Sequence, residues 1–455
     1  MRFTSLRPAP RPPSLPRLPA LSALAAALLM ALPGLAAAQS LQEIYDAARA
    51  FDATYLAAKA TAVSAEYKAA QVEALARPTL SATATAGLTQ TDLPNTNAKG
   101  TNTLSGGVNG RYPLFNRVNN ASIEQARKAL VSAQADLDTA EQDLIVRVAQ
   151  AYFDVLAAQD ALSATRANKA ATSEQLASAK RNFEVGTATI TDTREAQARF
   201  DLGTAQEIAA ENDLRTKRLA LDTVVGRLNV TPKALAVPVV LPGPVPANPE
   251  EWVTVADQVH PAVRRARIGL DVAVLETAKA RAGQLPTVDA VASITGSDAH
   301  GTLPTANRTA GTTTVANVGV QMNWVLFSGG AVQNRIKETT ALEEKSRNDL
   351  EAARRGVVQG TRAAFFGVQS GLAQVKALEA AESSTKLALE ATQLGYKVGV
   401  RVNLDVLNSQ LQLFTTQRDL AKARYDVLVG GLKLRQAAGQ LAPTDIDAVN
   451  RLLAK

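Results

Sequence analysis

Residues able to carry catalytic chemistry are scarce in this chain of 455 residues. It contains no cysteine and two histidines, His260 and His300. It also lacks the glycine-rich phosphate loop, the His-Glu-x-x-His zinc motif and the Gly-x-Ser-x-Gly nucleophile turn. The absence of cysteine excludes disulfides, thiolate metal sites and a lipid-acylated N-terminal cysteine. We therefore expect no enzymatic activity, no cofactor and no metal site.

Titratable residues with suggestive spacing follow two similar Val-Gly turns. Asp192 follows Val185-Gly186, and Asp405 follows Val398-Gly399. One explanation is that both carboxylates stand at helix starts, where the helix dipole favours negative charge. The alternative is that identical chains bring Asp405 together around a symmetry axis. Such a ring of like charges would select for cations and would make full ionisation of the ring costly.

The two turns belong to a sequence repeat that covers most of the chain. Asp192 and Asp405, Phe153 and Phe366, and Gly226 and Gly439 are separated by the same number of residues. A proline-rich stretch, typical of an extended connector, lies between the copies. The spacing predicts two structural repeats with flanking segments: 39–226, a connector at 227–250, 251–440, and a C-terminal tail at 441–455.

Each repeat switches from an alternating pattern to a helical one. Residues 79–90, 101–114, 287–296 and 313–326 alternate apolar and polar side chains, which predicts strands with one apolar and one polar face. A short helix is expected before each pair of strands.

Long helices are expected after the strands, at 117–185 and 192–225 and again at 331–395 and 404–437. Residues 117–185 contain neither Gly nor Pro, so this helix could extend roughly 100 Å at 1.5 Å per residue. Alanine and leucine recur along it at heptad spacing. This pattern is typical of coiled coils and helical barrels.

The N-terminus has the organisation of an export signal. Four arginines precede an apolar run at 20–32, and Leu35-Ala36-Ala37-Ala38 resembles a cleavage site. We predict a signal peptide at 1–38, cleaved after Ala38; a short N-terminal anchor is the alternative. These four arginines account for much of the net charge of +7. The charge therefore gives no indication that the protein binds nucleic acid.

The alternating strands have the length of strands that cross an outer membrane. Four strands cannot close a barrel, and an open edge in lipid is costly. A membrane-spanning sheet must therefore be shared, and three chains would supply twelve strands. Aromatic residues at the strand–helix junctions would then lie at one membrane interface: Tyr112, Phe115, Trp324 and Phe327. The alternative is a soluble antiparallel sheet that caps a coiled coil.

The sequence resembles the TolC family of outer-membrane exit ducts. The resemblance rests on Gln-Ala-Tyr-Phe-Asp-Val-Leu at 150–156, Arg-Asn-Phe-Glu-Val-Gly at 181–186 and Gly-Tyr-Lys-Val-Gly at 395–399. It implies a mainly α-helical protein with a transmembrane β-sheet. In a homotrimer this would form a twelve-stranded β-barrel in the outer membrane, continued by a long α-helical barrel through the periplasm. Members of the family serve drug efflux and type I protein secretion. They dock on a periplasmic adaptor and an inner-membrane RND, MFS or ABC transporter.

The resemblance also implies roles for residues near the second turn. By this resemblance, Asp405 corresponds to an aspartate that narrows the periplasmic entrance in the family. Tyr396 and Arg401 correspond to residues that hold the entrance shut, with Thr191 and Asp192 as their partners. An Arg401–Asp192 ion pair is therefore expected.

This sequence departs from the family's type member at one gate position. Asn408 stands where the type member has a second aspartate. We therefore expect only moderate cation selectivity, which depends on Asp405.

Two questions stay open at the level of sequence. A periplasmic coiled-coil adaptor or scaffold is the alternative function, although an adaptor would have one helical hairpin where this chain has two. Drug efflux and protein secretion are not distinguished, since both use one type of duct.

Overall fold

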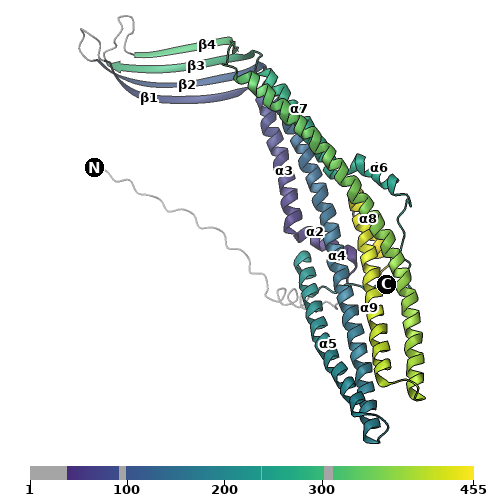
Figure 1. Cartoon of the computed structure of the whole chain (residues 1–455). Helices are drawn as coiled ribbons and strands as arrows, with labels where there is room; N and C mark the ends of the chain where they lie inside the picture. Colours follow the sequence, from purple (N-terminus) through teal and green to yellow (C-terminus); the bar gives the residue numbers. More distant parts are fainter. Residues whose placement is uncertain (1–37, 92–98, 237, 302–310, 455) are drawn as a thin grey trace, which may run out of the picture.

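The chain is elongated, with a four-stranded sheet at one end and helices along the rest of its length (Figure 1). The computed structural model describes residues 38–91, 99–236, 238–301 and 311–454. The predicted signal peptide lies outside these residues, except for Ala38.

Both halves of the chain have the same order of elements: two helices, two strands, a very long helix and a shorter helix. The first half contains α2 (Leu41–Phe51), α3 (Ala53–Glu73), the 3-10 turn η1 (Ala74–Ala76), β1 (Thr79–Thr91), β2 (Lys99–Phe115), α4 (Arg117–Glu184) and α5 (Ile190–Val225). The second contains α6 (Pro249–Val259), α7 (Pro261–Ala282), β3 (Thr287–Gly301), β4 (Gly311–Asn323), α8 (Ala331–Lys397) and α9 (Asn403–Ala437), followed by α10 (Thr444–Asn450).

Each half contains two helices before its strands, where one short helix was expected. Asp52 separates α2 from α3, and its carboxylate accepts a hydrogen bond from the Tyr55 N–H at 2.8 Å. His260 separates α6 from α7, and its Nδ1 accepts from the Ala262 N–H at 3.1 Å. Pro261 has no N–H and disfavours helical backbone at His260, so the chain must begin a new helix there. The fourth strand also ends at Asn323, earlier than the expected 326.

The strands form one antiparallel sheet in the order β1-β2-β3-β4, with β1 and β4 at its edges. Residues that face the same side lie opposite one another across the sheet. Leu80 pairs with Gly110, Gly110 with Ala292, and Ala292 with Val318. Leu80 and Val318 are 78% and 89% exposed. The alternation seen in the sequence thus produces a broad apolar face that nothing in the described part of the chain covers.

The opposite face of the sheet is polar. Thr79 lies opposite Arg111, and Ser81 lies opposite Asn109. An ion pair joins β2 to β3 on this face, with 2.6 Å between Nη2 of Arg111 and Oδ2 of Asp289. The sheet therefore has two faces of opposite chemistry.

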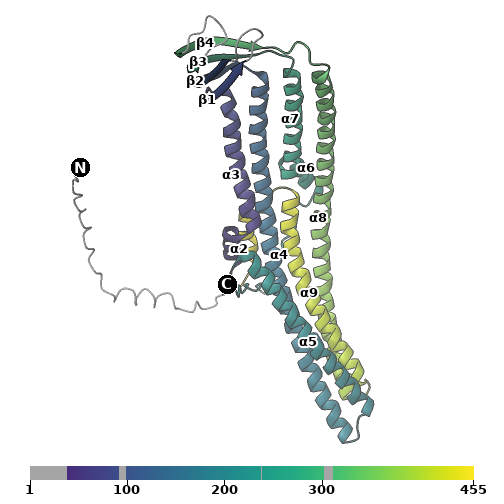
Figure 2. The ribbon, with the colours of Figure 1, turned by 90° about the vertical axis from the view of Figure 1, so that its left-hand side faces the viewer.

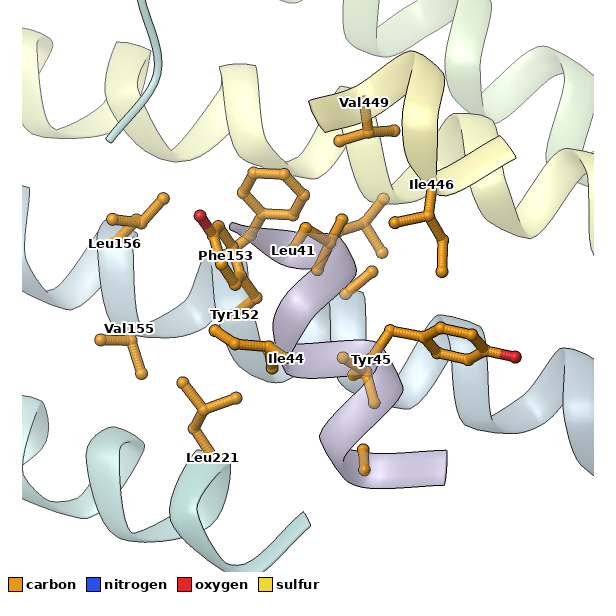
Figure 3. Close-up of a cluster of buried hydrophobic side chains, with 14 of the residues drawn as sticks. Leu41, Ile44, Tyr45, Tyr152, Phe153, Val155, Leu156, Leu221, Ile446 and Val449 are labelled. Carbon is orange, nitrogen blue, oxygen red and sulfur yellow. The ribbon is translucent and has the colours of Figure 1, made fainter. Parts of the chain in front are cut away.

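The long helices run side by side, and the largest hydrophobic cluster lies midway along them (Figure 2, Figure 3). Tyr152 and Phe153 of α4 are almost completely buried here, so the 150–156 motif serves packing. The Tyr152 hydroxyl donates a hydrogen bond to the Lys233 carbonyl at 2.9 Å, and burial raises its pKa. The cluster joins segments from both ends of the chain, including Leu41, Ile44, Tyr45, Leu221, Ile446 and Val449 (Figure 3).

Asp52 also anchors α3 to α4. Its two carboxylate oxygens each accept a hydrogen bond of 2.9 Å from the guanidinium of Arg147. Burial acts to raise the pKa of Asp52, but hydrogen bonds from Arg147 and from the backbone outweigh it and keep the pKa below its ordinary value. This bidentate pair therefore stabilises the helix junction.

The shorter helices α5 and α9 are both followed closely by a left-handed glycine. Gly226 and Gly439 have φ angles of +72° and +71°, in the left-handed region that favours glycine. A Cβ atom on Gly226 would lie 2.2 Å from the ring of Phe51, and one on Gly439 would lie 2.6 Å from Cα of His260. Both halves thus bring a return helix into close contact with the junction between their first two helices.

Candidate functional site at the tips of the helical hairpins

The two Val-Gly turns lie at the end of the molecule farthest from the sheet, where α4 turns into α5 and α8 turns into α9 (Figure 1). Gly186 and Gly399 have φ angles of +75° and +81°. Val185 and Val398 precede them with nearly identical backbone angles. Because a left-handed residue ends a helix, each turn stops a long helix and reverses the chain. The structure therefore brings the residues singled out in both halves to one end of the molecule.

Asp192 caps α5. Its Oδ2 accepts hydrogen bonds from the backbone N–H of Thr189 at 3.0 Å and from the Thr189 hydroxyl at 2.7 Å, while the Asp192 N–H donates to that hydroxyl at 3.1 Å. This is a capping box, which satisfies backbone groups at a helix start. The capping interpretation of Asp192 is therefore correct for the single chain. Thr191, beside it, is exposed.

Arg401 contacts a different carboxylate from the one expected. Its Nη1 lies 3.5 Å from Oδ2 of Asp405, and the expected Arg401–Asp192 pair is not formed within the described chain. Two reasons account for the difference. Asp405 is only four residues from Arg401 in the chain, so the guanidinium can reach it without any movement of the helices. The Asp192 carboxylate is already occupied by Thr189.

Polar contacts join the two hairpins near their tips. The Asn182 Nδ2 donates to the Tyr396 hydroxyl at 3.4 Å, which links α4 to α8. The Arg199 Nη2 donates to Oδ1 of Asn408 at 2.9 Å, which links α5 to α9. These contacts would resist a movement of one hairpin relative to the other.

Asn403 forms the most buried of these links, with 1% of its surface exposed. Its Oδ1 accepts a hydrogen bond from the Gln175 side chain, and its Nδ2 donates to the Asp192 carbonyl at 3.4 Å. Asn403 therefore holds the start of α9 to both α4 and α5. Asn403 was not predicted from the sequence, although a polar side chain at the helix start, in line with buried apolar positions such as Val406 and Leu407, was a usable signal.

A small apolar cluster supports the tip beneath these polar groups. Leu407 of α9 packs against Leu176 and Ala179 of α4 and Ala196 of α5, with Phe200 at the margin. The small alanine side chains let the helices approach closely.

The four aromatic residues lie at the end of the sheet that joins the helices. Tyr112 and Phe115 belong to β2, whereas Trp324 and Phe327 follow the end of β4. Trp324 donates from Nε1 to the Gln284 carbonyl at 3.0 Å. Phe327 is 89% exposed. The exposed rings thus gather at one level of the molecule.

The described residues contain no group of three or more His, Asp or Glu side chains placed to hold a metal ion. None of their helices is long and apolar enough to cross a membrane.

A long helical body that ends in an amphipathic sheet is the fold of known outer-membrane channel protomers. The structure aligns with the CmeC outer membrane channel of Campylobacter jejuni at a TM-score of 0.76, with 15% sequence identity, over 91% of this chain and 90% of that one. The chain belongs to the outer membrane efflux protein family, whose sequence profile matches residues 44–227 and 252–440.

Two individual relatives support this family assignment. The chain is 33% identical to the outer membrane protein TolC of Vibrio cholerae, over 93% of this chain and 96% of that protein. It is 34% identical to the alkaline protease secretion protein AprF of Pseudomonas aeruginosa, over 68% of this chain and 64% of that protein.

Proposed function

We propose that this protein is a passive outer-membrane exit duct, built from three identical chains and opened at its periplasmic tip. The observation that carries the proposal is the sheet. Its apolar face is exposed, with Val318 at 89%, and β1 and β4 stand at its two edges. Exposed apolar surface and unpaired strand edges both require a partner. Three copies would supply twelve strands, enough for a closed barrel with an aqueous interior.

The two halves of the chain would arise from an internal duplication, with repeats at 39–226 and 251–440. Two features support this: the left-handed glycines Gly226 and Gly439, and the helix-capping side chains of Asp52 and His260. In a trimer, the six helical hairpins would then form a hollow α-helical barrel through the periplasm.

The cargo would pass from an inner-membrane RND, MFS or ABC transporter through a periplasmic adaptor into this duct. AprF is named for protease secretion, and BepC of Brucella suis, 27% identical over 76% of this chain, is named an efflux protein. Relatives of both kinds support a duct that serves drug efflux, type I secretion or both.

The gate would lie at the hairpin tips. Asp405 and Asn408 would line the constriction, and Tyr396, Arg401, Thr191 and Asp192 would hold it shut through contacts between helices. Exposed ion pairs contribute at most about 1 kcal/mol each. Several weak contacts per chain would therefore give a latch that an adaptor could open.

The barrel is tested by a pair of substitutions on adjacent residues of β4. Val318→Arg places a charge on the apolar face, where it would cost about 2–4 kcal/mol near the membrane midplane. Asn317→Arg, on the polar face, is the matched control. We expect heat-resistant trimers in the outer-membrane fraction for the wild type and for Asn317→Arg, and far fewer for Val318→Arg. A soluble monomer, or equal loss in both variants, would contradict the barrel.

Two further observations complete the test. N-terminal sequencing of the exported protein should begin at Gln39. Wild-type trimers should form ion channels in planar lipid bilayers, whereas a periplasmic adaptor or scaffold would form none.

A further inference from the structure

Arg199 occupies a position beside the expected constriction that the sequence analysis did not assign. Asp405 and Asn408 are three residues apart near the start of α9 and so share one face of this helix. Arg401 precedes the helix, and its guanidinium reaches Asp405 on that face. The guanidinium of Arg199, from α5, reaches Asn408 on this face and donates from Nη2 to Oδ1 at 2.9 Å. Arg199 therefore adds a positive charge next to the side chain that stands in place of a second aspartate.

This positive charge is not neutralised by its partner. Asn408 is an amide, and Arg199 forms no ion pair with a carboxylate in the described part of the chain. The carboxylate of Asp405 is paired with Arg401 at 3.5 Å. The four side chains thus carry two guanidinium groups and one carboxylate. Because an arginine side chain does not lose its proton in proteins, this balance holds at any physiological pH.

We propose that Arg199 sets the charge preference of the periplasmic entrance, so that the closed channel favours anions over cations. The proposal rests on the trimeric duct described above, in which α9 lines the entrance. Rings of arginine or lysine select for anions in other pores, as rings of carboxylates select for cations. The direction is opposite to the moderate cation selectivity expected from Asp405 and a neutral Asn408. The two expectations differ because the sequence alone does not show that α5 packs beside α9, which places the charge of Arg199 next to Asn408.

Ion selectivity of the full-length trimer provides the test. The reversal potential is measured for single channels in planar bilayers across a KCl gradient. We expect wild-type channels to favour chloride. Arg199→Gln keeps a hydrogen-bond donor for Asn408 but removes the charge, and should shift the permeability ratio several-fold toward potassium. Asn408→Asp should shift it in the same direction, because a new carboxylate would neutralise Arg199.

Two control variants separate charge from packing. Arg199→Lys keeps the charge and should keep the anion preference. Arg194→Gln removes a charge from an exposed position on another face of α5 and should leave the reversal potential unchanged. If Arg199→Gln does not assemble into heat-resistant trimers, Asn408→Asp decides the question.

The outcomes distinguish this inference from the proposed function. Wild-type trimers that form no channels would refute both. Functional channels that favour potassium, or whose reversal potential does not respond to Arg199→Gln or Asn408→Asp, would refute the role of Arg199 and leave the duct intact.

Discussion

Arg401 and Asp405 form an ion pair across the turn that begins α9, with 3.5 Å between Nη1 and Oδ2. Both side chains are partly exposed, at 62% and 38%. An ion pair in such a position contributes between zero and about 1 kcal/mol, because water screens it and two long side chains must be ordered. The contact can therefore be exchanged for another at little cost, as a gate residue requires.

Arg401→Ala should increase leakage through the closed duct. The substitution removes the guanidinium that the proposed latch requires and leaves Asp405 unpaired. We expect larger single-channel conductance and faster entry of a large antibiotic or dye into cells. Arg418→Ala, which breaks the exposed Arg418–Asp419 contact farther along α9, is the control. If both variants behave as the wild type, Arg401 is no latch residue.

Asp405→Ala should make the entrance more selective for anions. It deletes one carboxylate per chain and leaves Arg401 without its counter-charge. The reversal potential across a salt gradient measures the change, and Asp419→Ala on the same helix should not alter it. Unchanged selectivity in Asp405→Ala would place this carboxylate outside the conduction path.

Asn403→Ala should loosen the two hairpins from each other. The substitution removes two hydrogen bonds at a buried position and leaves Gln175 without its acceptor. An unsatisfied buried polar group costs about 1–3 kcal/mol. We expect higher conductance with the trimer still assembled.

The matched control for Asn403 is Ser409→Ala. Its hydroxyl donates to Thr392 at 3.3 Å and links α8 to α9 within one hairpin. An equal effect of the two substitutions would mean that contacts between the hairpins have no special part in gating.

Gly439→Ala should destabilise the fold more than Gly399→Ala. Both glycines have positive φ, and a left-handed conformation costs another residue about 1–2 kcal/mol. A Cβ on Gly439 would also meet the backbone of His260 at 2.6 Å, whereas a Cβ on Gly399 meets nothing within 4 Å. The temperature at which trimers dissociate in detergent measures the difference. If both substitutions lower this temperature equally, the end of α9 is not in close contact with the backbone of His260.

His260 should make stability depend on pH. Burial lowers its pKa, and its Nδ1 must be unprotonated to accept the Ala262 N–H. A histidine with a lowered folded pKa contributes stability that is present above its unfolded pKa, about 6.5. This stability is lost as the pH falls from that value through the lower pKa of the folded state. Thermal stability of the trimer should therefore decrease between neutral pH and about pH 5.

His260→Asn should reduce this pH dependence, because asparagine also caps helices but does not titrate. His300→Asn, at the far end of β3, should retain it. If His260→Asn loses as much stability on acidification as the wild type, other groups cause the effect.

The four strands, the two very long helices and the family of this protein could be predicted from its sequence. Alternation places Leu80 and Val318 on one face of the sheet, because strand side chains alternate whatever surrounds them. The Val-Gly turns end the long helices because a left-handed residue terminates a helix locally. Such features depend on neighbours in the chain, and the sequence therefore reveals them.

Which side chains of the two hairpins meet at the tips depends on how the helices pack. Asn182 and Tyr396, Gln175 and Asn403, and Arg199 and Asn408 are each more than 200 residues apart in the chain. Their contacts follow from the rotation and depth at which α4 and α5 pack against α8 and α9, which small residues such as Ala179 and Ala196 permit. The Arg401–Asp405 pair is different, because its two residues are only four positions apart in the chain. The charge of the proposed entrance therefore depends on how the helices pack, and the list of its acidic residues does not reveal it.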